Sequence, residues 1–174
     1  MDEVSYVARR AGLELGVREF QPAASLRYLS ANGALAAAVQ AATGQGLPAA
    51  GRLVAAGACW LAWRSPTETI VVAEEPGPIE RLVGAVGEQE DGCALELSGA
   101  LAGISLAGPA LAELICRLGG PAPGASPGEA CRVRLADVAV LILCPRPQTV
   151  QLLIERPLCG HLLGWIRETV LDLA

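Results

Sequence analysis

Lysine is absent from this chain of 174 residues, so all 13 basic residues are arginines. This absence excludes a Schiff-base lysine, a phosphate-loop lysine and a lysine general base. Aromatic residues make up only 3% of the chain, and there is a single histidine, His161. Because no nucleophile motif such as Gly-x-Ser-x-Gly accompanies it, we interpret His161 as a structural or surface residue.

Closely spaced cysteine pairs are also missing. The six cysteines contain no CxxC pair, which makes zinc binding and dithiol chemistry poor interpretations. Several of them lie inside apolar runs, as Cys59 does beside Trp60. We therefore interpret them as small buried hydrophobic residues in a reducing compartment.

The charge pattern excludes two further classes of protein. A net charge of −5 without a basic cluster argues against nucleic-acid binding. No charge falls between Arg27 and Arg52, but alanine, glycine and polar residues dominate that stretch, so it does not predict a membrane span. The acidic start, Met1–Glu3, is unlike the basic start of a secretory signal. We expect a cytoplasmic protein.

Hydrophobic residues, at 52% of the chain, are sufficient for a substantial core. Spacings of three and four residues predict four helices, and apolar or alternating runs predict strands between them. The predicted helices are Asn32–Thr43, Pro78–Val86, Pro109–Leu118 and Pro157–Leu171. The predicted strands are Leu13–Phe20, Leu26–Leu29, Ala58–Trp63, Thr69–Val72, Ile104–Leu106, Cys131–Leu135, Val138–Leu143 and Val150–Ile154.

The order of these elements repeats. Strand, helix, two strands and helix follow one another in each half, which predicts an α+β fold of two similar βαββα half-domains with helices packed on antiparallel sheet. We assign residues 21–90 to the first half and 91–174 to the second, in one compact unit. Residues 1–20 form an N-terminal segment that a partner is expected to order. The Pro/Gly-rich stretch Pro121–Gly128 is interpreted as an exposed loop.

No arrangement of residues predicts catalysis, cofactor binding or a metal site in this chain. Carboxylates at Glu74–Glu75 and Glu88–Asp91 are interpreted as solvated charges, and Asp137 as a hairpin-turn residue. Tryptophan and arginine are frequent in protein interfaces. The interface candidates are Trp60, Trp63, Arg64, Arg132 and Arg134. Trp60 and Trp63 are three apart on a strand and should occupy opposite faces.

Several short segments, taken in order, resemble the sarcosine oxidase gamma subunit family, within the folate-binding aminomethyltransferase-like superfamily. One of them is Ile104–Ala110, which resembles the Leu-Ser-Gly-Pro-x-Ala helix entry of that family. The others are Trp63–Glu68, Ala94–Ser98, Pro127–Cys131, Glu155–Pro157 and Leu162–Trp165. Ser65, Thr67 and Pro157 depart from the family pattern, which leaves the expected fold intact but weakens the case for a shared binding surface.

The resemblance implies a non-catalytic companion in a heterotetrameric flavoenzyme complex. Such a complex demethylates sarcosine or a related N-methyl amino acid oxidatively and passes the one-carbon unit to tetrahydrofolate. The expected partners are the alpha, beta and delta subunits. Flavin, NAD and tetrahydrofolate are expected on those partners and not on this chain.

Two alternatives remain open at this point. The first is a stand-alone module that binds folate or a similar ligand in a groove between the half-domains. The second is an independent hydrolase, which would require a nucleophile–base pair that uses His161.

Overall fold

The computed structural model describes residues 6–10, 12–120 and 127–173, with backbone alone for 6–10. By internal contacts the chain divides into two units, Gln21–Gly99 and a second unit made from Met1–Phe20 with Ala100–Ala174. From the sequence we expected the boundary between residues 90 and 91. The contacts place it after Gly99 because the strand Gly92–Glu96 pairs within the first unit. Part of the predicted loop Pro121–Gly128 lies outside the described residues.

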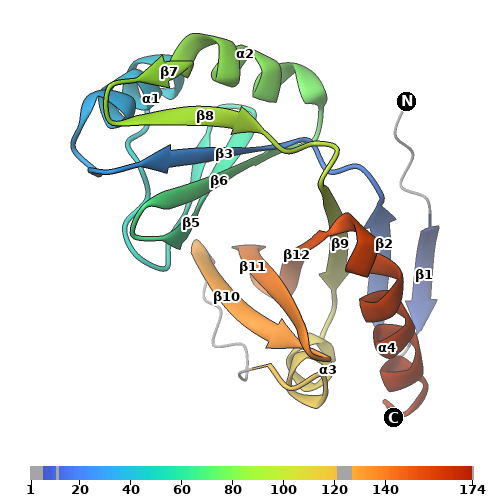
Figure 1. Cartoon of the computed structure of the whole chain (residues 1–174). Coiled ribbons are helices and arrows are strands. Elements are labelled where there is room, and N and C mark those ends of the chain that lie inside the picture. The colour runs from blue at the N-terminus through green and yellow to red at the C-terminus, as the bar shows by residue number, and fades with distance from the viewer. Residues whose placement is uncertain (1–5, 11, 121–126, 174) are drawn as a thin grey trace. The chain divides into compact units, whose positions relative to one another are not determined.

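The Gln21–Gly99 unit is a six-stranded antiparallel sheet with two helices, α1 and α2, on one face (Figure 1). The strand order in space is β4-β5-β6-β3-β8-β7. The element bounds are β3 Ala23–Tyr28, α1 Ala34–Thr43, β4 Leu53–Ala56, β5 Cys59–Ser65, β6 Glu68–Ala73, α2 Pro76–Val86, β7 Glu88–Gln89 and β8 Gly92–Glu96.

The second unit is also a six-stranded antiparallel sheet, in the order β1-β2-β9-β12-β11-β10, with helices α3 and α4 packed against it (Figure 1). Its element bounds are β1 Tyr6–Arg10, β2 Leu13–Arg18, β9 Leu101–Ala107, α3 Leu111–Arg117, β10 Glu129–Leu135, β11 Val138–Arg146, β12 Thr149–Glu155, the 3-10 turn η1 Arg156–Leu158 and α4 Cys159–Leu171. The predicted α+β class, with helices on antiparallel sheet, is confirmed.

The two units repeat one topology. The order β4-β5-β6-β3 in one sheet matches β10-β11-β12-β9 in the other. Along the chain, helices follow β3 and β6 in the first set and β9 and β12 in the second. Each repeat therefore has the order βαβββα and not the predicted βαββα, and one strand of the first repeat was not predicted. The additional strand, β4, is short and alanine-rich, so its pattern is weak.

The strands that precede each repeat are exchanged between the units. β2 comes before β3 in the chain but pairs with β9, whereas β8 comes before β9 but pairs with β3. The two ends of the Gln21–Gly99 unit are hydrogen-bonded to each other, because the Leu97 amide donates to the Ala23 carbonyl oxygen at 2.8 Å. This unit is thus a continuous segment inserted between β2 and β9.

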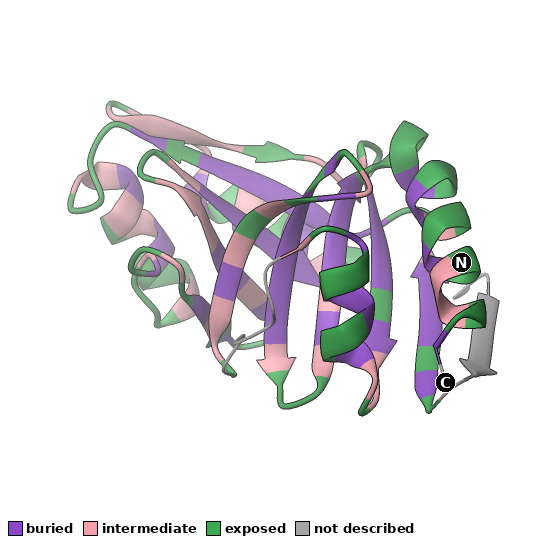
Figure 2. Ribbon diagram, turned by 90° about the horizontal axis from the view of Figure 1, so that it is seen from below, coloured by how far each residue is buried: buried purple, intermediate pink, exposed green. Residues whose placement is uncertain are grey.

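Each unit has its own core between its sheet and its helices (Figure 2). In the second unit Ile104, Leu114, Leu152 and Leu162 are fully buried together. β11 lies between β12 and β10 and is buried continuously from Val140 to Cys144, as predicted for a central strand. No helix within the described residues has the length and apolar character needed to cross a membrane.

Helix ends differ from the predictions in detail. The N-cap residue of α1 is Gly33 and not Asn32. At the other end of α1 the C-cap residue is Gly44, in the left-handed conformation, as expected. Pro109 precedes α3, and Pro157 lies in η1. Because η1 turns more tightly than an α-helix, Leu158 leaves the predicted buried stripe and is exposed, whereas Leu162 and Ile166 are buried.

Candidate functional site

The interface candidates Trp60 and Trp63 lie on β5. Cys59 and Leu61 point into the core beneath the helices, so the alternation of the strand turns Trp60 to the opposite face and Trp63 to the helix face. Both tryptophans are half-buried. A bulge between Trp63 and Ser65 changes the register immediately after Trp63.

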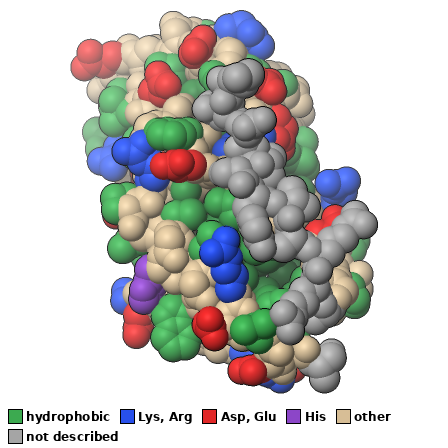
Figure 3. Space-filling view, turned by 90° about the vertical axis from the view of Figure 1, so that its right-hand side faces the viewer, with side chains coloured by type: hydrophobic (Ala, Val, Ile, Leu, Met, Phe, Trp, Pro, Cys, Tyr) green, Lys and Arg blue, Asp and Glu red, His purple; other side chains and the backbone are tan. Residues whose placement is uncertain are grey.

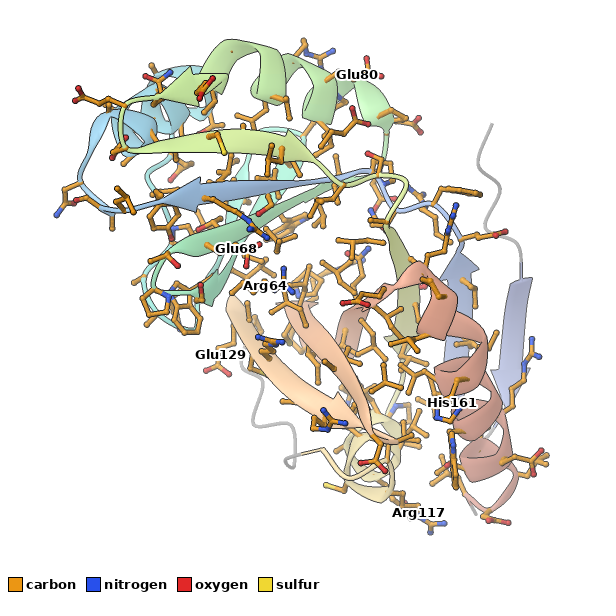
Figure 4. The ribbon with its side chains drawn as sticks, in the orientation of Figure 1. Arg64, Glu68, Glu80, Arg117, Glu129 and His161 are labelled. Carbon is orange, nitrogen blue, oxygen red and sulfur yellow. The ribbon has the colours of Figure 1, made fainter. Side chains whose placement is uncertain are left out.

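Arg64, the third candidate, is held within its own unit by Glu68. Its Nη1 atom donates to Glu68 Oε1 at 3.0 Å, and the fully buried Ser25 donates its hydroxyl to the same oxygen at 2.7 Å (Figure 4). Arg27 Nε lies 3.7 Å from that oxygen as well. Glu68 therefore holds one N–H group of the Arg64 guanidinium beside the β5–β6 turn.

Arg132 and Arg134 lie on β10, at the edge of the second sheet. They are exposed and alternate with Cys131 and Val133, which pack against the core. The Arg134 guanidinium donates to the Asp137 carbonyl oxygen in the β10–β11 turn, which confirms the turn predicted at Asp137. The five candidates thus belong to two different units.

His161 lies on the exposed side of α4, where its Nε2 atom is 3.3 Å from the Ala136 carbonyl oxygen (Figure 4). That contact is structural, as expected from the sequence. In the part of the chain that the structure describes, no three His, Cys, Asp or Glu side chains come together to hold a metal ion.

All six cysteines are free thiols. Burial raises the pKa of Cys59, Cys131, Cys144 and Cys159, and the Glu129 carboxylate raises the pKa of Cys131 and Cys144 further. A raised pKa keeps these thiols protonated and poorly nucleophilic at neutral pH. The interpretation as small buried residues holds for Cys59, Cys144 and Cys159, but Cys116 is exposed on α3.

Asp91 has a role that was not predicted from the sequence. The Leu35 amide, in the first turn of α1, donates to Asp91 Oδ1 at 2.8 Å, and the Leu29 amide donates to the Asp91 carbonyl oxygen at 2.8 Å. Asp91 therefore caps a helix 56 residues away in the chain. A Cβ atom at Gly33 would lie 1.6 Å from Asp91 Oδ2, so any other residue at that helix end would displace the capping carboxylate.

Replacing Asp91 with alanine should lower the free energy of unfolding by about 1 kcal/mol, because α1 loses its cap. Asp91→Asn keeps an oxygen that can accept from Leu35 and should recover much of that loss. Urea denaturation of both variants, with amide exchange at α1, measures the effect. Equal stability of Asp91→Ala and the unaltered chain would contradict the capping role.

The segment Glu88–Cys93, which contains Asp91, borders an open depression of about 620 Å³ in the Gln21–Gly99 unit. Its lining contains the carboxylates of Glu68, Glu88, Glu90 and Asp91 and a single basic residue, Arg27. This excess of negative charge is unfavourable for an anionic ligand.

The fold is of the aminomethyltransferase type. The chain is similar in structure to the glycine cleavage system aminomethyltransferase T from Bartonella henselae, with a TM-score of 0.67 and 12% identity. The match covers 90% of this chain and 46% of that protein, and at this identity it shows the fold alone.

More specific matches then define the family. The sarcosine oxidase gamma subunit family matches residues 27–170. The chain is 37% identical over 138 residues to the sarcosine oxidase subunit gamma of Corynebacterium sp. (strain U-96), covering 75% of this chain and 66% of that protein, just under two thirds of its length. The chain belongs to the sarcosine oxidase gamma subunit family, which confirms the resemblance found in the sequence.

A solved structure of a complex contains a chain that is similar in structure to this one. A chain of the heterotetrameric sarcosine oxidase from Corynebacterium sp. U-96, determined in complex with pyrrole 2-carboxylate, matches with a TM-score of 0.81 and 27% identity. The match covers 96% of this chain and 88% of that one, so it includes both units.

Proposed function

We propose that this chain is the non-catalytic gamma-type subunit of a heterotetrameric sarcosine oxidase-like flavoenzyme complex, and that it assembles and stabilises the large subunits. The observation that carries the proposal is the match, over 96% of this chain, to a chain of such a complex. In this proposal the alpha, beta and delta subunits carry flavin, NAD and tetrahydrofolate, and they oxidise sarcosine or a related N-methyl amino acid in the cytoplasm.

The chemistry of the described side chains supports an assembly role. The single histidine contacts a backbone carbonyl oxygen, and burial raises the pKa of four of the six thiols. The free cysteines are typical of a reducing compartment. The acidic depression in the Gln21–Gly99 unit would repel the carboxylates of a folate, which disfavours that surface as a folate site.

Co-expression tests this function. The tagged chain, produced with the other subunits of its complex, should co-purify with them in a fixed ratio, and leaving it out should lower the yield of assembled oxidase. A well-folded monomeric chain that retains none of those subunits would contradict the proposal. Micromolar binding of tetrahydrofolate by the isolated chain, measured by calorimetry, would instead favour the stand-alone module.

A further inference from the structure

Large apolar side chains are exposed where α4 begins and along its flank. Trp165 is 53% exposed, Leu158 39% and Phe20 38%, and all three belong to the second unit. Folded monomers seldom leave neighbouring large apolar groups in water unless the surface serves binding. This surface is distinct from the five candidates that the sequence suggested.

The arrangement of α4 explains why these side chains are not core. Leu162 and Ile166 form its buried stripe, and Leu158 and Trp165 lie two turns apart on the flank beside that stripe. His161 lies between them along the helix. On this face hydrophobic side chains are visible next to the histidine (Figure 3).

Arg156 gives the surface a charge. Its guanidinium carbon lies 4.7 Å from the centroid of the Phe20 ring, which holds the planar group in place. Within the described residues no carboxylate forms an ion pair with Arg156. A guanidinium stacked on a ring keeps its N–H groups directed outward in the plane, where they fit a carboxylate.

We propose that Phe20, Arg156, Leu158 and Trp165 form a docking surface for a partner subunit that presents an apolar patch flanked by a carboxylate. The proposal rests on the function proposed above, since it names how this chain holds its complex together. Tryptophan and arginine are the side chains that most often dominate binding energy in interfaces. A second copy of this chain fits less well, because a two-fold contact through this surface brings one Arg156 towards the other.

The test compares matched substitutions in the full chain. Trp165→Ala should weaken binding to the co-purified partner subunits about 30-fold, and Arg156→Glu about 10-fold or more. Leu29→Ala removes an apolar side chain that is 85% exposed in the other unit, and Arg52→Glu reverses an exposed charge there. Both controls should change the dissociation constant by less than about twofold.

The outcomes separate this surface from the function on which it rests. If the unaltered chain binds no partner subunit, the proposed function fails and the docking surface fails with it. If it binds, and both Trp165→Ala and Arg156→Glu bind as tightly as the controls, the docking surface alone is overturned. A dimer of the unaltered chain that Trp165→Ala dissociates would assign the surface to a second copy and would also overturn the proposal.

Discussion

Deleting residues 1–18 should unfold the Ala100–Ala174 part of the chain while the Gln21–Gly99 unit stays folded. The deletion removes β2 from its pairing with β9 and removes Leu13, Leu15 and Val17 from the core of the second unit. Burying each such side chain contributes about 1.5–3 kcal/mol, so the loss is about 5 kcal/mol or more, comparable with the whole stability of a domain.

Amide hydrogen exchange measures this effect unit by unit. β9, β11 and β12 should lose protection, whereas β3, β5 and β6 should keep it, because β3 and β8 pair within Gln21–Gly99. Glu14→Gln, at an exposed position of β2, is the matched control and should change stability by no more than about 0.5 kcal/mol. Undiminished protection of β9 in the deletion would contradict the exchanged-strand topology.

Replacing Gly108 with alanine should lower the free energy of unfolding by about 3 kcal/mol. Gly108 has a φ angle of 138°, and a Cβ atom there would lie 2.0 Å from the Gly12 carbonyl oxygen. Backbone atoms cannot move aside as a flexible side chain can, so the turn between β9 and α3 must distort. Thermal or urea denaturation of the full chain measures the loss.

Substitutions at two other glycines separate the cost of backbone strain from the cost of the steric clash. Gly119 has a φ angle of 86° but open space around it, so Gly119→Ala should cost only the backbone strain, about 1 kcal/mol. Gly84 lies inside α2 with open space around it, and Gly84→Ala should stabilise the chain by about 0.5–1 kcal/mol. If Gly108→Ala costs no more than Gly119→Ala, the close approach to Gly12 is not a constraint.

Much of the fold is predictable from the spacing of the hydrophobic residues along the chain. Ile79, Leu82 and Val86 follow the helical spacing and are buried in α2, and β11 is a continuous apolar run. The pairing of β2 with β9 is not predictable in this way, because alternation shows that a strand has a buried face but not which strand it joins. β4 was missed because its alanines give little strand signal.

The functional surface is harder to predict, because sequence does not show which charged groups are already paired. Arg64 was predicted as an interface candidate, and the structure adds that it donates a hydrogen bond to Glu68 across the β5–β6 turn. Asp91 looked like one of several solvated acids, yet it caps α1. Trp165 lies in a helix that was predicted from its buried stripe, and its exposure depends on the flank of α4 that the sheet leaves uncovered.

The most direct test of the central claim is the native mass of the complex that forms around this chain. Purified through a tag on this chain from co-expressed subunits, the assembly should have the mass of one copy of each of four different subunits and should carry bound flavin. A species with the mass of this chain alone, 17.9 kDa, or of its homo-oligomer would contradict the claim that this protein is an assembly subunit of a heterotetrameric oxidase.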